Sequence, residues 1–332
     1  MGHVILSLVF GVGFGPGDGR PAPSDEAVRA SAEKAIPLLV KGIEGYAEKR
    51  DCFSCHHQAV PVFALATARS RGLEVPEDTV EDAVALTDAD LREAIESYRK
   101  GNGQGGGVHR AGYALFTLEV GGAKPDDLTD AVADYLLRKD EDRGHWRSSS
   151  DRPPSEASEF SATYFALRSL KAYGRDGREQ KAAARAEKAR RWLETAAPRD
   201  TEDRVFRLLA MSAAGSPEDS IREAADDLLK TRNADGGWSQ LEGGTSDAYA
   251  TATALVALHL AGGLATDDPA YRQGLGFLIS SQLGDGSWHV ASRSKPFQPY
   301  FESGFPHGKD QFLSMAASAW AVSALCLALP AK

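Results

Sequence analysis

A repeated pattern of helix, short Gly-rich loop and aromatic residue constrains the fold of this 332-residue chain more than any other feature. In its clearest copy, Gly274-Leu275-Gly276-Phe277-Leu278 is followed by Gln282 and then by Gly286-Ser287-Trp288. A second copy ends in Gly236-Gly237-Trp238, and a third, which lacks the Gln, ends in Gly144-His145-Trp146. Self-similarity at intervals of tens of residues indicates a repeat architecture.

The segments between these loops predict an all-α fold of six helical hairpins, about twelve helices, closed into a ring. One helix of each pair is charged on one side and is expected in an outer ring: 25–48, 76–100, 126–138, 178–196, 217–231 and 268–281. The partners are shorter and richer in Ala and aromatic residues, so they are expected to crowd together in an inner ring: 60–70, 109–119, 158–171, 203–213, 246–261 and 311–328.

The Gly-x-x-Phe-Leu, Gln and Gly-x-Trp string at 274–288 resembles the QW motif of squalene-hopene cyclases. The whole pattern is similar to the prenyltransferase and squalene-cyclase repeat superfamily, which implies an α/α6 toroid over residues 24–332. The resemblance also implies that Gln282 and Trp288 are scaffold residues that tie an outer helix to the next hairpin.

Residues 1–23 are expected to be an export signal and linker. An apolar run of eleven residues, Val4 to Phe14, is followed by a Gly- and Pro-rich stretch, and such a run is too short to span a bilayer. We therefore expect a periplasmic or otherwise exported protein without a membrane span in its mature form. The net charge of -9 argues against a nucleic-acid partner and favours a small apolar ligand or a protein.

Cys52-Phe53-Ser54-Cys55-His56 is the strongest local motif. The C-x-x-C-H spacing is that of covalent haem c attachment, in which Cys52 and Cys55 hold the porphyrin and His56 binds the iron. The alternatives are a zinc or iron site that uses Cys52, Cys55, His56 and His57, or a structural cluster. A haem would take a further ligand, for which His307 is the preferred candidate, since ring closure brings the long insertion 295–308 toward the motif.

The catalytic acid motif and the zinc-binding residues of these families are incomplete in this sequence. The acid of squalene-hopene cyclases is the middle Asp of an Asp-x-Asp-Asp string, and the nearest strings, 88–91 and 140–143, lack the last Asp. Only 8% of the residues are aromatic, which also argues against a standard terpene cyclase. The Asp, Cys and His zinc triad of protein prenyltransferases does not carry over either.

Three functions therefore stay open from the sequence. The first is an exported toroid that binds haem c or a metal and serves in electron transfer or redox sensing with a partner protein. The second is an enzyme that acts on an isoprenoid or other apolar substrate inside the toroid, with Asp247, Glu302, His307 and Asp310 as candidate catalytic groups. The third is a non-catalytic binding scaffold.

Overall fold

The computed structural model describes residues 22–175, 177–296 and 298–331. In these residues thirteen α-helices form and no β-strand does. A π-helical turn, η1 (Cys55–Ala59), and a 3-10 turn, η2 (Gly308–Asp310), each lead into an inner helix. The α-helices are α1 (Asp25–Ala47), α2 (Val60–Ser70), α3 (Glu77–Glu93), α4 (Ile95–Arg99), α5 (Gly107–Val120), α6 (Asp127–Arg138), α7 (Glu159–Tyr173), α8 (Glu179–Thr195), α9 (Thr201–Ala213), α10 (Glu218–Lys230), α11 (Ala248–Leu260), α12 (Pro269–Ser281) and α13 (Gln311–Leu327).

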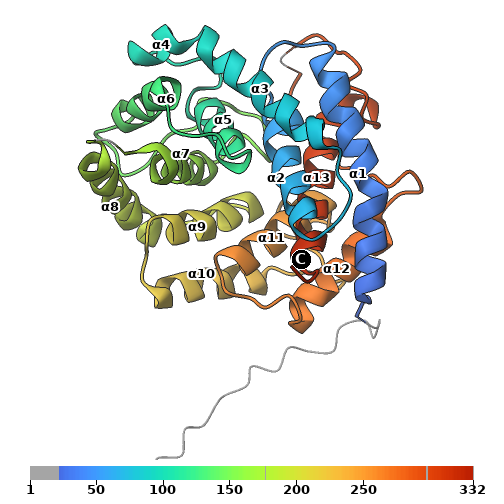
Figure 1. Cartoon of the computed structure of the whole chain (residues 1–332). Coiled ribbons are helices and arrows are strands. Elements are labelled where there is room, and N and C mark those ends of the chain that lie inside the picture. Colours follow the sequence, from blue (N-terminus) through green and yellow to red (C-terminus); the bar gives the residue numbers. More distant parts are fainter. Residues whose placement is uncertain (1–21, 176, 297, 332) are drawn as a thin grey trace, which may run out of the picture.

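The helices form two concentric layers, as the sequence predicts (Figure 1). Helices α2, α5, α7, α9, α11 and α13 pack each against the next, and α13 packs against α2 to close the inner ring. Helices α1, α3, α6, α8, α10 and α12 lie outside them. The prediction of a closed α/α toroid is confirmed.

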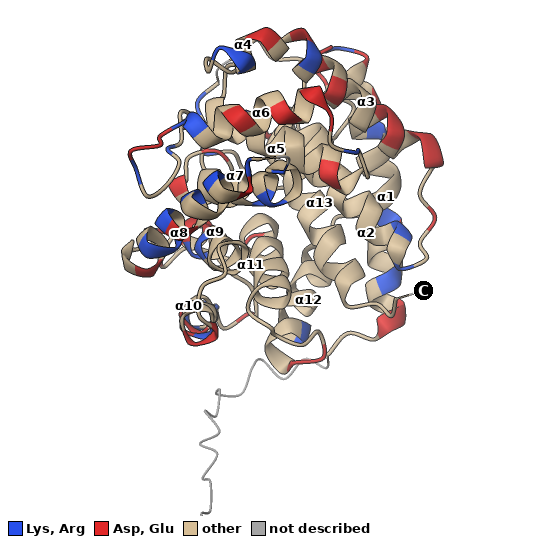
Figure 2. Cartoon of the chain, turned by 60° about the vertical axis from the view of Figure 1, so that its left-hand side comes forward, with Lys and Arg blue, Asp and Glu red and all other residues tan. Residues whose placement is uncertain are grey.

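The difference between the layers follows from side-chain polarity. Residues 248–258 of α11 are buried on every side of the helix, as expected for a helix that is apolar all round. The outer helices are rich in Lys, Arg, Asp and Glu, whereas the inner helices α11 and α13 contain none of these residues (Figure 2). The apolar stripe of each outer helix packs toward the inner ring, and α3 adds an ion pair from Asp90 to Arg110 of α5.

Three tryptophans join the layers by one repeated geometry. The indole N–H groups of Trp146, Trp238 and Trp288 donate to carbonyl oxygens near the ends of α6, α10 and α12, at 2.8, 3.0 and 2.8 Å. Their backbone N–H groups donate to hydroxyl oxygens of the following inner helices, which belong to Thr163, Thr251 and Ser318. Each tryptophan thus fastens an outer helix to an inner one.

The side chain of Gln282 links the last outer helix, α12, to the first, α1. The side chain accepts a hydrogen bond from Ser31 Oγ and donates to the backbone oxygens of Ser31 and Gly286, all at 2.9 Å. The last outer helix is thereby tied to α1, 251 residues earlier. The scaffold role expected for Gln282 and Trp288 agrees with these contacts.

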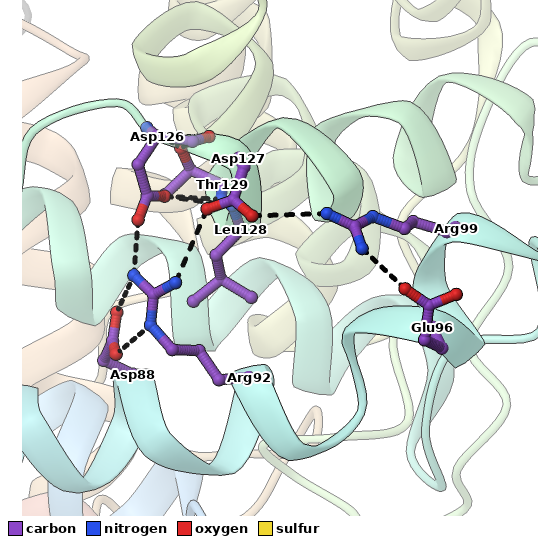
Figure 3. A network of polar contacts seen from close by, with 8 residues as sticks. All are labelled: Asp88, Arg92, Glu96, Arg99, Asp126, Asp127, Leu128 and Thr129. Carbon is purple, nitrogen blue, oxygen red and sulfur yellow. Dashed lines mark hydrogen bonds and ion pairs between the residues drawn. The ribbon is translucent and has the colours of Figure 1, made fainter.

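The predicted outer helix 76–100 is broken into α3 and α4 at Ala94. The break turns Tyr98 inward, where it is fully buried with its ring edge against Tyr135. On the surface, Arg92 of α3 pairs with Asp88, Asp126 and Asp127, and Arg99 of α4 pairs with Asp127 and Glu96 (Figure 3). These ion pairs hold both pieces against the start of α6.

The predicted export segment lies almost wholly outside the described residues. In the part of the chain that the structure describes, no helix is long and apolar enough to cross a membrane.

Candidate functional site

The Cys52–His56 motif lies in the connection between α1 and α2, and Cys55 begins the π-helical turn η1. In this turn the backbone N–H of Val60 donates to Cys55 O, five residues back. Such wide turns are rare and occur frequently at functional sites. The turn separates the motif's side chains into two groups with different surroundings.

The first group gathers at a buried carboxylate, Glu156, which lies between α6 and α7 in sequence. His56 Nε2 lies 2.9 Å from Ser155 Oγ, and His56 Nδ1 lies 3.8 Å from a Glu156 oxygen. The other Glu156 oxygen pairs with Arg152. Burial raises the pKa of the Cys55 thiol well above its usual value, and the Glu156 charge adds to that effect. Cys55 is therefore a protonated thiol rather than a ready nucleophile.

The second group surrounds Tyr46 of α1. Cys52 Sγ lies 3.5 Å from Tyr46 Oη. The His57 ring stacks on the Tyr46 ring with 4.9 Å between centroids. His57 is completely buried, and neither of its ring nitrogens has a hydrogen-bond partner among the described residues.

The separation of the motif's side chains into two groups decides whether they can bind haem c or a metal ion. Haem c needs both thiols at the porphyrin edge and a free ring nitrogen on His56, whereas Cys52 contacts Tyr46, Cys55 faces Glu156 and His56 Nε2 is bonded to Ser155. The arrangement therefore does not fit a haem, and haem attachment stays a prediction. Within residues 22–175, 177–296 and 298–331, no group of three or more His, Cys, Asp or Glu side chains is placed to hold a metal ion.

The insertion 295–308 approaches the motif, but through an aromatic residue rather than through His307. Phe301 lies 5.8 Å from the Tyr46 ring. His307 instead bonds Ser287 Oγ through Nε2 at 2.7 Å and stacks on His289 at 4.9 Å. His307 is thus not directed at the iron position expected for it.

The other three candidate catalytic residues lie in different surroundings. Asp310 accepts hydrogen bonds from His289 Nε2 and from a backbone N–H, so it shares one cluster with His307. Asp247 caps α11 by accepting from Ala250 N, and burial raises its pKa. Glu302 is exposed and bonded to Tyr300. The four residues do not form one constellation.

A buried acid that the sequence did not single out lies on the inner ring. Glu202, in the first turn of α9, is 5% exposed; one carboxyl oxygen lies 3.3 Å from Tyr249 Oη and the other has no partner in the described chain. Burial, helped by the charge of Asp200, raises the pKa of Glu202 well above its usual value. The protonated acid is therefore favoured.

Glu202 lies beside Tyr249 of the next inner helix. Burial raises the pKa of Tyr249 well above its usual value, with smaller contributions from Glu202 and from Tyr113 of α5, the helix on the opposite side of the inner ring. Burial likewise raises the pKa of Tyr113 well above its usual value, with a smaller contribution from Glu202. All three side chains are buried, and we call Tyr113, Glu202 and Tyr249 the interior acid cluster.

A chain of aromatic contacts continues from this cluster. The Tyr113 and Phe165 rings lie 3.7 Å apart by their centroids, and the neighbouring ring pairs lie between 5.5 and 5.7 Å apart. We call this set the aromatic belt, which consists of Phe63, Tyr113, Phe116, Phe165, Phe206 and Trp320. Five of the six inner helices contribute to it. The overall aromatic content of 8% does not reveal this local concentration of rings.

The fold defines the class: an α/α toroid of the kind found in type II terpene cyclases. The apo cyclase MstE from Scytonema superposes with a TM-score of 0.57 and 17% identity, over 93% of this chain and 99% of that chain. An MstE variant in complex with geranylgeranyl dihydroxybenzoate, its substrate, gives 0.59 and 16% identity, over 92% and 98%. At such identities the likeness concerns the fold alone.

In sequence, a squalene–hopene cyclase from Bradyrhizobium diazoefficiens is 35% identical over 132 residues. That alignment covers 34% of this chain and 19% of the cyclase, so the similarity extends over about a fifth of the relative's length. No protein-family model matches the chain.

Proposed function

We propose that this protein takes up an apolar, isoprenoid-class molecule between its inner helices and transfers a proton to it from Glu202. The observation that carries the proposal is a buried carboxylic acid with one unpartnered oxygen, placed beside Tyr249 on the inner ring. The toroid fold and the partial similarity to a squalene–hopene cyclase support the substrate class.

The chemistry follows from the surroundings of Glu202. A protonated acid gives up its O–H proton to the substrate, and the Tyr249 hydroxyl donates a hydrogen bond to the carboxylate left behind. The substrate becomes a cation, which the electron-rich faces of the aromatic belt stabilise. When the product loses a proton, Glu202 takes it back and the acid is restored.

The raised pKa of Glu202 limits which substrates this acid can protonate. Burial keeps Glu202 protonated but also makes it a weaker acid. A weak acid transfers a proton more readily to an oxygen lone pair than to an alkene carbon. We therefore favour a polyprenyl chain with a terminal epoxide over the plain hydrocarbon.

The test is to incubate the purified full chain with epoxidised squalene and, separately, with squalene, and to analyse the extracts by gas chromatography and mass spectrometry. Cyclised or rearranged product is expected from the epoxide. Glu202→Gln keeps the size and neutrality of the side chain and removes the acid, so turnover should fall at least about 100-fold while the ligand is still retained.

Glu302→Gln is the matched control, because Glu302 is an exposed acid whose side chain is bonded to Tyr300 and not to the interior acid cluster. Its turnover should equal that of the unaltered chain. Equal turnover by Glu202→Gln would refute the assigned acid. Retention of the ligand without any product would support the binding scaffold instead, and no retention would overturn the proposed function altogether.

A further inference from the structure

His57 is a buried polar side chain that the proposed reaction does not use. It has no exposed surface, and both ring nitrogens lack a hydrogen-bond partner among the described residues. Buried polar atoms are nearly always bonded, so an exception points to a missing partner such as an ion. Burial and the neighbouring His56 lower the pKa of His57 well below its usual value. The ring is therefore neutral and has a free nitrogen lone pair.

Aromatic rings enclose His57. The Tyr46 ring stacks on it at 4.9 Å, and the edge of Phe312 meets it at 5.0 Å. The Phe301 ring lies 5.8 Å from the Tyr46 ring and 5.6 Å from the Phe312 ring. We call Tyr46, His57, Phe301 and Phe312 the histidine box. An apolar enclosure of this kind makes a net charge inside it costly.

Cys52 is the thiol at the edge of the histidine box. Its sulfur lies 3.5 Å from Tyr46 Oη, the residue is half-buried, and the thiol is not in a disulfide. Cys52 thus places a sulfur atom beside the Tyr46 ring on which His57 stacks, and a thiolate sulfur is a metal ligand.

We propose that Cys52 Sγ and a ring nitrogen of His57 bind one Cu(I) ion. Thiolate and imidazole are ligands that suit copper, and thiolate sulfur selects the soft Cu(I) state. One thiolate neutralises one monovalent cation, so the bound pair brings no net charge into the histidine box. This site is independent of the proton transfer proposed for Glu202.

The number of ligands also favours Cu(I). Zinc in a structural site takes four protein ligands, and no group of three or more metal-binding side chains forms in the described part of the chain. Cu(I) accepts two ligands. On binding, the Cys52 S–H bond breaks, its proton goes to solvent, a sulfur–copper bond forms, and the ion leaves its carrier without any change in oxidation state.

The experiment titrates the metal-free, haem-free full chain with Cu(I) held by bicinchoninate, under anaerobic and reducing conditions. Loss of the coloured Cu(I) complex measures transfer, and one equivalent should bind. Cys52→Ser and His57→Phe should each weaken binding at least about 100-fold. Phe keeps the histidine box filled, and circular dichroism checks that both variants fold.

Two matched variants separate this pair of ligands from the rest of the motif. Cys55→Ser and His56→Gln should still bind one equivalent, since these side chains face Glu156 and Ser155 instead. X-ray absorption should show one sulfur and one nitrogen neighbour. Binding that survives His57→Phe, binding lost in Cys55→Ser, tighter binding of Zn²⁺ than of Cu(I), or purification of the chain with covalent haem on Cys52 would each overturn the proposal.

Discussion

Replacing Trp288 by Phe tests whether the indole N–H bonds hold the two layers of the toroid together. The variant keeps an aromatic ring but removes the donor to Leu278 O, a bond of 2.8 Å in a fully buried setting. A lost hydrogen bond that leaves a buried partner unpaired costs about 1–3 kcal/mol, and the smaller ring loses about 1 kcal/mol of packing. We expect the free energy of unfolding to fall by about 3 kcal/mol.

Trp320→Phe is the matched control. Trp320 is also buried, but its indole nitrogen has no hydrogen-bond partner in the described chain. Its replacement removes an unsatisfied donor, so only the packing loss of about 1 kcal/mol should remain. The difference of about 2 kcal/mol between the two variants is the contribution assigned to the hydrogen bond.

The assay is urea unfolding followed by circular dichroism, with the midpoints and slopes of the variants compared. Trp238→Phe should repeat the loss seen at Trp288, because it removes the same bond from the preceding repeat. A Trp320→Phe variant as unstable as Trp288→Phe would refute the assigned role of the indole N–H. So would a Trp238→Phe variant that unfolds like the unaltered chain.

Two further predictions concern acid stability and haem. Burial lowers the pKa of His109 to about 4, so the folded chain binds fewer protons than the unfolded one and loses roughly 3 kcal/mol of stability as pH falls from 6.5 to 4. His109→Gln should reduce that loss in pH-dependent unfolding, and an unchanged pH profile would contradict the assignment. If Cys52 and Cys55 attach haem, chain produced with a haem-maturation system and denatured in alkaline pyridine will show haem c absorption bands that Cys55→Ser lacks; unaltered chain without these bands would rule out attachment.

The ring could be predicted because its signals are local and repeated. Each Gly-x-Trp loop lies at the end of an apolar-patterned helix, and ten residues separate Leu278 from Trp288 just as they separate Leu228 from Trp238. The break at Ala94 could not be predicted in this way. It depends on the burial of Tyr98 against a ring from α6, which is a tertiary contact.

The surroundings of the site were less predictable than its motif. Glu156 and Ser155 reach His56 from about a hundred positions away, and no local pattern links them to Cys55. Glu202 resembled an ordinary acid in the first turn of a helix, where a carboxylate stabilises the helix dipole. Its chemistry comes from burial beside Tyr249, which the sequence does not display.

The bond between Gln282 and Ser31 has a consequence for how the molecule comes apart. In an open solenoid the terminal repeats have one neighbour each, so unfolding can begin at either end. Here the first and last hairpins are also neighbours, through Gln282 and through the packing of α13 on α2. Releasing any hairpin therefore breaks two interfaces instead of one, and the toroid has no repeat from which fraying can begin.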